Sequence, residues 1–250
     1  MKRVLVTGGA SGIGLAAAQR FIAEGDSVCI FDLNVEAVAS AALTLGEKAI
    51  GVAGSVASVS DLQTAVDAMI DAFGGVDCAV TCAGIVKVEP SFDVTPENFL
   101  KTLEVNVLGS FATAQVAAKH MAKHGGGSIV MLGSVYGEGG APDRASYCAS
   151  KGAVHQLVRS LAVEWGGLGI RVNAVAPTGV RTPMVQALID SGTYDLGGVK
   201  GRTPLGRLAE AEEVADACWF LASDQARMVT GHILPVDGGW LANGFVLKRT

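Results

Sequence analysis

The sequence has no long apolar run, no cluster of basic residues and no paired-cysteine motif. No apolar stretch reaches the ~20 residues that a helix needs to span a bilayer, so we expect no membrane partner. Lysine and arginine never occur more than two in a row, and the net charge is −5. Nucleic acids and anionic membrane surfaces attract basic patches, so neither is an expected partner.

The cysteines also point away from a metal or disulfide framework. There are five, with no Cys-x-x-Cys spacing and no histidine spacing typical of zinc. We therefore predict no metal site and interpret them as small, buried or half-buried residues in a reducing cytosol. The opening residues resemble a signal peptide, but the apolar part stops at Thr7, which is too short. We predict a cytoplasmic protein. The cysteines are Cys29, Cys78, Cys82, Cys148 and Cys218.

Short apolar runs alternate with helix-period patterns along all 250 residues, half of which are apolar. Nearly continuous apolar strands between helices are typical of a parallel sheet covered on both faces. Right-handed crossovers then predict an α/β fold with a doubly wound, seven-stranded parallel sheet of the Rossmann type. The expected strands are 2–7, 27–32, 49–53, 77–81, 128–132, 170–174 and 233–236. The expected helices lie near 13–24, 35–45, 59–73, 97–123, 145–165 and 211–222.

The chain shows no repeat, low-complexity tract or linker, so we expect one domain over residues 1–250. Residues 182–207 form the longest stretch without a clear period. Long loops in compact domains are usually functional, and we predict that this one is a lid over a substrate pocket.

A glycine-rich turn follows the first expected strand. Gly8, Gly12 and Gly14 stand between that strand and the helix from Leu15. Glycines there allow a tight turn and let backbone N–H groups approach a pyrophosphate at the helix N-terminus. The spacing differs from Gly-x-Gly-x-x-Gly, but its position between a strand and a helix at the start of the chain favours a dinucleotide site.

Asp32 ends the second strand, 18 residues after Gly14. A carboxylate there accepts hydrogen bonds from an adenosine ribose diol and repels a 2′-phosphate. No Arg or Lys lies between Ser27 and Glu47 to neutralise such a phosphate, so we expect NAD rather than NADP.

Tyr147 and Lys151 lie four residues apart in an expected helix and therefore share a face. Free tyrosine titrates near ~10, and a neighbouring ammonium favours the phenolate. Such a pair is a proton donor and acceptor suited to neutral pH. Ser134 lies just before it in the sequence, after the fifth strand.

Together these motifs resemble the short-chain dehydrogenase/reductase family, in its short single-domain branch, over residues 2–239. The resemblance implies a catalytic tetrad of Asn106, Ser134, Tyr147 and Lys151. Val236-Asp237-Gly238-Gly239 is similar to the C-terminal signature. The implied cofactor-binding residues are Gly8, Ser11, Gly12, Ile13, Gly14, Asp32, Ser55, Val56, Cys82, Ala83, Gly84, Tyr147, Lys151, Pro177, Gly179, Val180 and Thr182.

Three positions depart from the family pattern. Thr81-Cys82 replaces two asparagines, so a polar stabiliser of the central sheet is expected to be missing or substituted. Ser55 replaces an aspartate that accepts from the adenine amino group. Thr178 separates the usual Pro-Gly pair and places a side chain near the cofactor or substrate.

The resemblance implies reversible hydride transfer between a secondary alcohol and a nicotinamide. Tyr147 is the expected general base or acid, Lys151 and the nicotinamide charge lower its pKa, and Lys151 also bonds the ribose. Ser134 stabilises the substrate oxygen. Asn106 holds a water that links Lys151 to solvent, and Thr182 orients the carboxamide. The family also implies a homotetramer, and the apolar tail 240–247 is expected to pack on a neighbour.

Two other functions remain open. A 3-oxoacyl-thioester reductase is the second enzyme reading, although such enzymes usually take NADPH and Asp32 argues against that. A dinucleotide-sensing protein without turnover is the third, opposed by the intact Ser134, Tyr147 and Lys151. A further hypothesis is that Lys87, Arg144 and Arg181 attract an anionic or highly polar substrate. An apolar substrate stays open as the alternative, favoured by Val135, Tyr136, Met184 and Val185. The four histidines carry no motif and receive no role.

Overall fold

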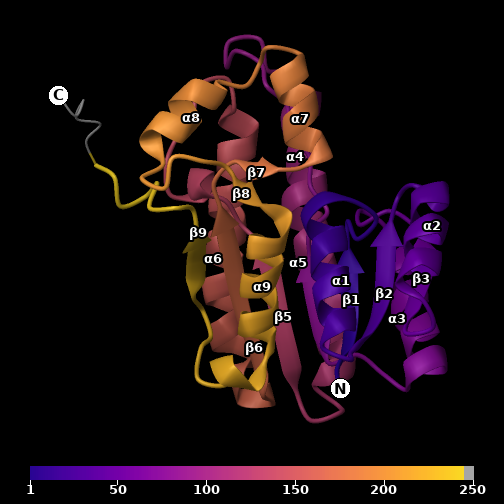
Figure 1. Ribbon diagram of the computed structural model, residues 1–250. Helices are drawn as coiled ribbons and strands as arrows, with labels where there is room; N and C mark the ends of the chain where they lie inside the picture. Colours follow the sequence, from indigo (N-terminus) through magenta and orange to yellow (C-terminus); the bar gives the residue numbers. More distant parts are fainter. Residues whose placement is uncertain (245–250) are drawn as a thin grey trace.

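The structure is a computed structural model that describes residues 1–244 (Figure 1). Seven parallel strands form the main sheet in the order β3-β2-β1-β4-β5-β6-β9. This confirms the predicted doubly wound sheet, and most strand boundaries fall within one residue of expectation. The strands are β1 (Arg3–Thr7), β2 (Ser27–Asp32), β3 (Ala49–Ala53), β4 (Cys78–Thr81), β5 (Gly127–Leu132), β6 (Ile170–Pro177) and β9 (Ile233–Val236).

Helices cover both faces of this sheet, because successive side chains along each strand point to opposite sides. Leu5 joins one apolar cluster, and its neighbours Val4 and Val6 join the other. The first cluster packs the sheet against α3, α5 and α6, and the second packs it against α1, α2 and α9. The bounds are α1 (Gly12–Ala23), α2 (Val35–Leu45), α3 (Val59–Phe73), α4 (Pro96–Leu103), α5 (Gly109–Met121), α6 (Ala145–Trp165) and α9 (Ala211–Ala222).

The helix expected over 97–123 is interrupted, and this prediction was wrong in detail. A π-helical turn, Glu104–Leu108, separates α4 from α5. Such turns are often found at functional sites. Here the turn carries Asn106, whose amide bonds to residues outside the helix. The sequence did not reveal the interruption, because the apolar period continues on both sides of it.

The segment 182–207 was expected to be irregular, but it holds two helices, α7 (Pro183–Asp190) and α8 (Leu196–Arg202). Thr182 caps α7 by accepting from the Val185 N–H, and Asp195 caps α8 by accepting from the Gly198 N–H. Three glycines inside α8 obscure its period. Two short strands, β7 (Val180–Arg181) and β8 (Ala209–Glu210), pair at the base of the segment. Both helices lie beyond the carboxyl ends of the main strands, at the top of Figure 1.

The end of the described chain returns to the protein's own surface. Trp240 was expected to pack on a neighbouring subunit, yet it is 5 % exposed within this chain. Its ring meets the edge of Tyr136 at 5.7 Å between centroids, and the Arg202 guanidinium lies 3.8 Å above it. The part of the expected tail from 245 to 247 lies outside the described residues. Within residues 1–244, every helix is too short or too polar to cross a bilayer.

Candidate active site

A cavity of about 460 Å³ lies where the main strands end, beneath α7. It brings together residues from both halves of the chain, as expected of a site at the carboxyl edge of a doubly wound sheet. Asn106 and Gly179 are the two predicted site residues absent from its lining. The predicted residues that line it are Gly8, Ser11, Gly12, Ile13, Gly14, Asp32, Ser55, Val56, Cys82, Ala83, Gly84, Ser134, Tyr147, Lys151, Pro177, Val180 and Thr182.

The glycine-rich turn is built so tightly that it has no space for side chains. Gly8 has a φ of +66°, and a Cβ there would lie 2.5 Å from the Ala83 nitrogen. A Cβ on Gly14 would collide with the Gly8 carbonyl oxygen. Helix α1 begins at Gly12, so its unpaired N–H groups and positive dipole end lie at the cavity. This arrangement suits a pyrophosphate.

Asp32 ties the end of β2 to that turn. Its Oδ2 accepts from the Ala10 N–H at 3.2 Å, and its Oδ1 accepts from the Leu33 N–H at 2.8 Å. The carboxylate is thereby held at the cavity with lone pairs remaining for a ribose diol. Next to it, the Ser55 N–H donates to Asp61 at 2.9 Å. Asp61, missed at the sequence level, orients the loop that carries Ser55.

Lys151 is buried, with 4 % of its surface exposed. Its Nζ donates to the Leu132 carbonyl oxygen at 2.7 Å and lies 5.6 Å from the centre of the Tyr147 ring. Burial disfavours the ammonium and lowers the pKa of Lys151 to about 8. This lysine therefore lies near its protonation midpoint at mildly alkaline pH, unlike a solvated lysine.

Tyr147 lies between Ser134 and Lys151, and its ring is half-buried. Burial raises the pKa of Tyr147 to about 12, and a hydrogen bond with the Ser134 hydroxyl acts in the opposite direction. In the polypeptide by itself desolvation outweighs the favourable neighbours, and the expectation that Lys151 and a bound nicotinamide together lower this pKa stays a prediction. A phenolate at neutral pH therefore requires additional positive charge.

Asn106 is fully buried beside the cavity rather than in its wall. Its Nδ2 donates to the Ile85 carbonyl and to Ser150 Oγ, each at 3.0 Å, and its Oδ1 accepts from the Ile85 N–H at 2.8 Å. The amide thus fixes the chain after Gly84, which lies against Lys151. Its expected role in holding a water stays a prediction.

Gly179 makes room for Tyr194, a residue that the sequence did not single out. A Cβ at this position would collide with the Tyr194 hydroxyl, so the glycine lets Tyr194 approach the backbone. Tyr194, Tyr136 and Tyr147 are all the tyrosines of the sequence. Tyr136 meets the edge of Tyr147 at 6.5 Å between centroids, and both influence the pKa of Tyr194, which burial raises to about 12. The available signal was Tyr194 as the sole aromatic residue in 182–207.

None of the three cations proposed to attract an anionic substrate lines the cavity. Lys87 pairs with Glu89 at 3.1 Å, Arg181 pairs with Glu210 at 3.1 Å, and neither lines the cavity. Arg144 donates to the Thr193 carbonyl at 3.2 Å and influences the pKa of all three tyrosines. Arg144 alone lies near the tyrosines, and its bond to Thr193 anchors the loop between α7 and α8.

The central sheet lacks the polar stabiliser that the family pattern supplies. Thr81 and Thr7 are paired across β4 and β1, and both hydroxyls are buried without a hydrogen-bond partner. Cys82 follows Thr81 and lines the cavity, but burial raises the pKa of its thiol to about 12. The cysteine is therefore an inert, apolar part of the wall.

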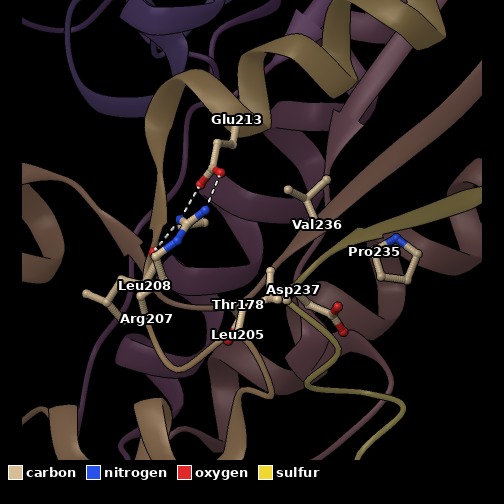
Figure 2. A pocket seen from close by; sticks show the side chains of 10 residues that line it. Thr178, Leu205, Arg207, Leu208, Glu213, Pro235, Val236 and Asp237 are labelled. Atoms are coloured by element: carbon tan, nitrogen blue, oxygen red, sulfur yellow. Dashed lines mark hydrogen bonds and ion pairs between the residues drawn. The ribbon is translucent and has the colours of Figure 1, made fainter.

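A second, smaller hollow of about 240 Å³ lies behind Thr178, which lines both cavities (Figure 2). Arg207 and Glu213 form a two-pronged ion pair there, with N–O distances of 2.6 and 2.7 Å. Arg207 also donates to the Leu208 carbonyl at 3.1 Å. These bonds fix the chain where it returns from α8 to the body of the protein.

Comparisons with known proteins identify the family of this chain. A family model described as "Enoyl-(Acyl carrier protein) reductase" matches residues 8–241. D-threitol dehydrogenase of Mycolicibacterium smegmatis is 38 % identical over 242 residues, covering 96 % of this chain and 92 % of that protein. 2-(R)-hydroxypropyl-CoM dehydrogenase of Xanthobacter autotrophicus is 40 % identical and covers 97 % of this chain and 100 % of that one. The chain belongs to the short-chain dehydrogenase/reductase family.

A solved short-chain dehydrogenase/reductase from Mycobacterium ulcerans superposes with a TM-score of 0.91 at 33 % identity, covering 97 % of this chain and 90 % of that one. The family uses a nicotinamide cofactor. This short-chain dehydrogenase/reductase is therefore an oxidoreductase of CH–OH groups that acts on a small molecule. Among residues 1–244, no group of three or more His, Cys, Asp or Glu side chains is placed to hold a metal ion.

Proposed function

We propose that the enzyme is an NAD-dependent dehydrogenase of a secondary alcohol, and a reductase of the matching ketone. The observation that carries this proposal is that Ser134, Tyr147 and Lys151 line the same cavity as the glycine-rich turn. A dinucleotide bound at the turn would occupy the cavity that these three side chains line, and they would supply the groups for proton transfer beside its hydride carrier.

The nicotinamide, when bound, supplies the hydride acceptor or donor at its C4 carbon. Tyr147 takes the alcohol proton during oxidation and returns it during reduction. Ser134 Oγ donates to the substrate oxygen as negative charge develops there. Lys151 would hold the ribose hydroxyls, and the charge of the oxidised nicotinamide would add the positive charge that Tyr147 requires. Thr182 orients the carboxamide, and Asn106 holds the water that links Lys151 to solvent.

The preference for NAD rests on Asp32. Its carboxylate is fixed at the cavity by the backbone of Ala10 and Leu33. A 2′-phosphate would meet this negative charge without a compensating cation on β2 or α2. The adenine amino group lacks the usual carboxylate acceptor, because Ser55 stands there.

The substrate is a small polar compound with several hydroxyl or ether groups. Tyr136 and Tyr194 lie near Tyr147 with Arg144 beside them, although none of the three is part of the cavity lining. D-threitol, in the name of one relative, is a compound of this kind. Helices α7 and α8 form the lid over this side, within a single catalytic domain.

The proposal includes a cytoplasmic location and a homotetrameric state. A mostly apolar hollow of about 770 Å³ runs over α4, α5 and α6, and Leu100 and Leu108 in it are 63 % and 49 % exposed. Phe111 and Leu157 line the same hollow. Exposed apolar surface of this extent favours self-association.

The second candidate is a 3-oxoacyl-thioester reductase. The family model described as an acyl-carrier-protein reductase favours it, and Asp32 opposes it because such enzymes usually take NADPH. A dinucleotide sensor without turnover is a third candidate, opposed by the complete catalytic set at the cavity.

The test is NADH or NADPH formation across polyols, sugars, hydroxy acids, hydroxyacyl thioesters and sterols, with Tyr147→Phe as control. We expect turnover with NAD⁺ on a polyol or sugar-like alcohol and none with Tyr147→Phe. Activity confined to NADP⁺ and hydroxyacyl thioesters would establish the second candidate instead. Tight NAD⁺ binding without turnover of any alcohol would favour the sensor.

A further inference from the structure

A buried histidine lies directly behind the catalytic turn. His155 stands on α6, one helical turn beyond Lys151, and is 1 % exposed. A Cβ on Gly133 would lie 2.5 Å from its ring, and a Cβ on Gly137 would collide with it. The two glycines that flank Ser134 therefore make room for this ring.

The ring is bonded to the turn on both sides. The Ser134 N–H points at His155 Nε2, with a long N–N distance of 3.5 Å, and His155 Nδ1 lies 3.0 Å from Glu138 Oε1. Since a backbone N–H only donates and a carboxylate only accepts, one tautomer satisfies both contacts. Nε2 accepts and Nδ1 carries the proton. This assignment follows from the partners.

The same turn sets the catalytic hydroxyl. Ser134 Oγ accepts from the Tyr136 N–H at 3.2 Å, so the backbone between Gly133 and Gly137 determines where Oγ and the Tyr136 ring lie. Both flank Tyr147. A shift of this turn would move Ser134 Oγ, the group that contacts the substrate oxygen.

We propose that His155 is a positioning residue that holds the Ser134–Gly137 turn through its neutral ring, and that protonation of the ring displaces Ser134 and stops catalysis. Protonated Nε2 would face the Ser134 N–H, so two donors would oppose each other inside the protein. This inference rests on the proposed dehydrogenase function, because its main readout is turnover.

The charges around the His155 ring determine the pH at which the ring becomes protonated. Glu138 of the turn favours the protonated ring, whereas Arg159 and Lys151 on α6 oppose it. Burial is the largest influence and keeps the pKa of His155 below its usual 6.5. The ring is therefore neutral at pH 7, and we expect catalysis to decline only under acidic conditions.

The kinetic test compares pH profiles of kcat and kcat/KM for three variants. His155→Met removes the acceptor and should lower kcat at least about tenfold without changing NAD⁺ affinity. His155→Gln keeps an acceptor that cannot titrate, so it should recover much of kcat and remove the acid limb. Glu138→Gln should move the acid limb to lower pH. His124→Gln, on an exposed histidine, is the matched control.

An unchanged acid limb in His155→Gln, or one that fails to move in Glu138→Gln, overturns the proposal. A second measurement needs no turnover: ¹⁵N NMR of the wild-type protein should show the His155 ring protonated on Nδ1 at pH 7. A proton on Nε2, or a charged ring, also overturns it. If wild type oxidises no alcohol but the Nδ1 tautomer is found, the proposed function fails while the inferred geometry stands.

Discussion

The glycine-rich turn and the lid segment 182–207 lie at the same cavity but are built in opposite ways. In the turn, a Cβ on Gly8 or Gly14 meets backbone, which cannot move aside. In the lid segment, Gly192, Gly201 and Gly206 meet nothing within 4 Å. The turn admits one backbone path, whereas the lid segment has open space for a side chain at Gly201, and its Gly192 and Gly206 are constrained only by their positive φ values of +73° and +70°. We propose that the first recognises the constant part of a dinucleotide and that the second adapts to a particular substrate.

The largest expected effect comes from replacing a glycine of the turn by alanine. The same replacement in the lid segment is the comparison. Gly14→Ala forces a Cβ onto the Gly8 carbonyl, so we expect NAD⁺ affinity to fall by at least about a hundredfold, or folding to fail. Gly201→Ala is the matched change in the lid, and it should stabilise α8 slightly and leave NAD⁺ affinity unchanged. Titration calorimetry of both variants measures this. Equal losses of NAD⁺ affinity in the two variants would contradict the contrast between the turn and the lid segment.

A smaller effect concerns the free energy of unfolding, which burial of the Lys151 ammonium lowers. The pKa of Lys151 falls from 10.5 to about 8, which corresponds to about 3 kcal/mol of unfolding free energy at neutral pH. The cost is complete below pH 8, where the folded and unfolded chains are both protonated. It disappears as the pH rises toward the unfolded value, because only the folded chain has lost its proton.

Lys151→Met should therefore be inactive yet melt at a higher temperature than wild type at pH 7. Loss of the bond to the Leu132 carbonyl offsets part of the gain. The advantage should shrink at pH 9.5. Thermal melts at the two pH values check this, and a variant less stable than wild type at pH 7 would contradict the burial argument.

Within the lid, Tyr194→Phe should act on the substrate alone. The change removes the hydroxyl held against Gly179 and keeps the ring. We expect KM for the alcohol to rise several-fold, the loss of about one hydrogen bond, and NAD⁺ affinity to stay the same. Phe92→Leu, at a fully exposed aromatic residue, is the control. A change in NAD⁺ affinity alone would place Tyr194 on the cofactor side.

The smallest expected effect lies in the sheet beneath the turn. Thr81→Val replaces a buried hydroxyl without a partner by a methyl group of similar size. We expect the free energy of unfolding to stay the same or rise by less than about 1 kcal/mol. Urea denaturation measures it. A loss above 1 kcal/mol would mean that the hydroxyl is bonded in solution.

The sequence predicted those features that local patterns determine. Strand β2 was placed correctly because its apolar run is short and bounded, and Asp32 and Gly14 followed from their distance to strand ends. Tyr147 and Lys151 lie at one cavity as expected, because one helix turn joins them, and their catalytic role stays a prediction. Residues that depend on distant partners were missed. His155 matters through Gly133 and Gly137, and Tyr194 through Gly179, and neither pairing leaves a period in the sequence.

The central claim is that the backbone of the glycine-rich turn holds the dinucleotide, whereas the Tyr147 hydroxyl transfers the proton at the same cavity. It is tested most directly by measuring NAD⁺ affinity and alcohol turnover side by side in Tyr147→Phe. Tyr147 contributes one hydroxyl beside a turn that holds the dinucleotide by its backbone. The account predicts NAD⁺ affinity within about threefold of wild type and a loss of turnover of ~10²-fold or more. Turnover that survives the substitution would contradict the account.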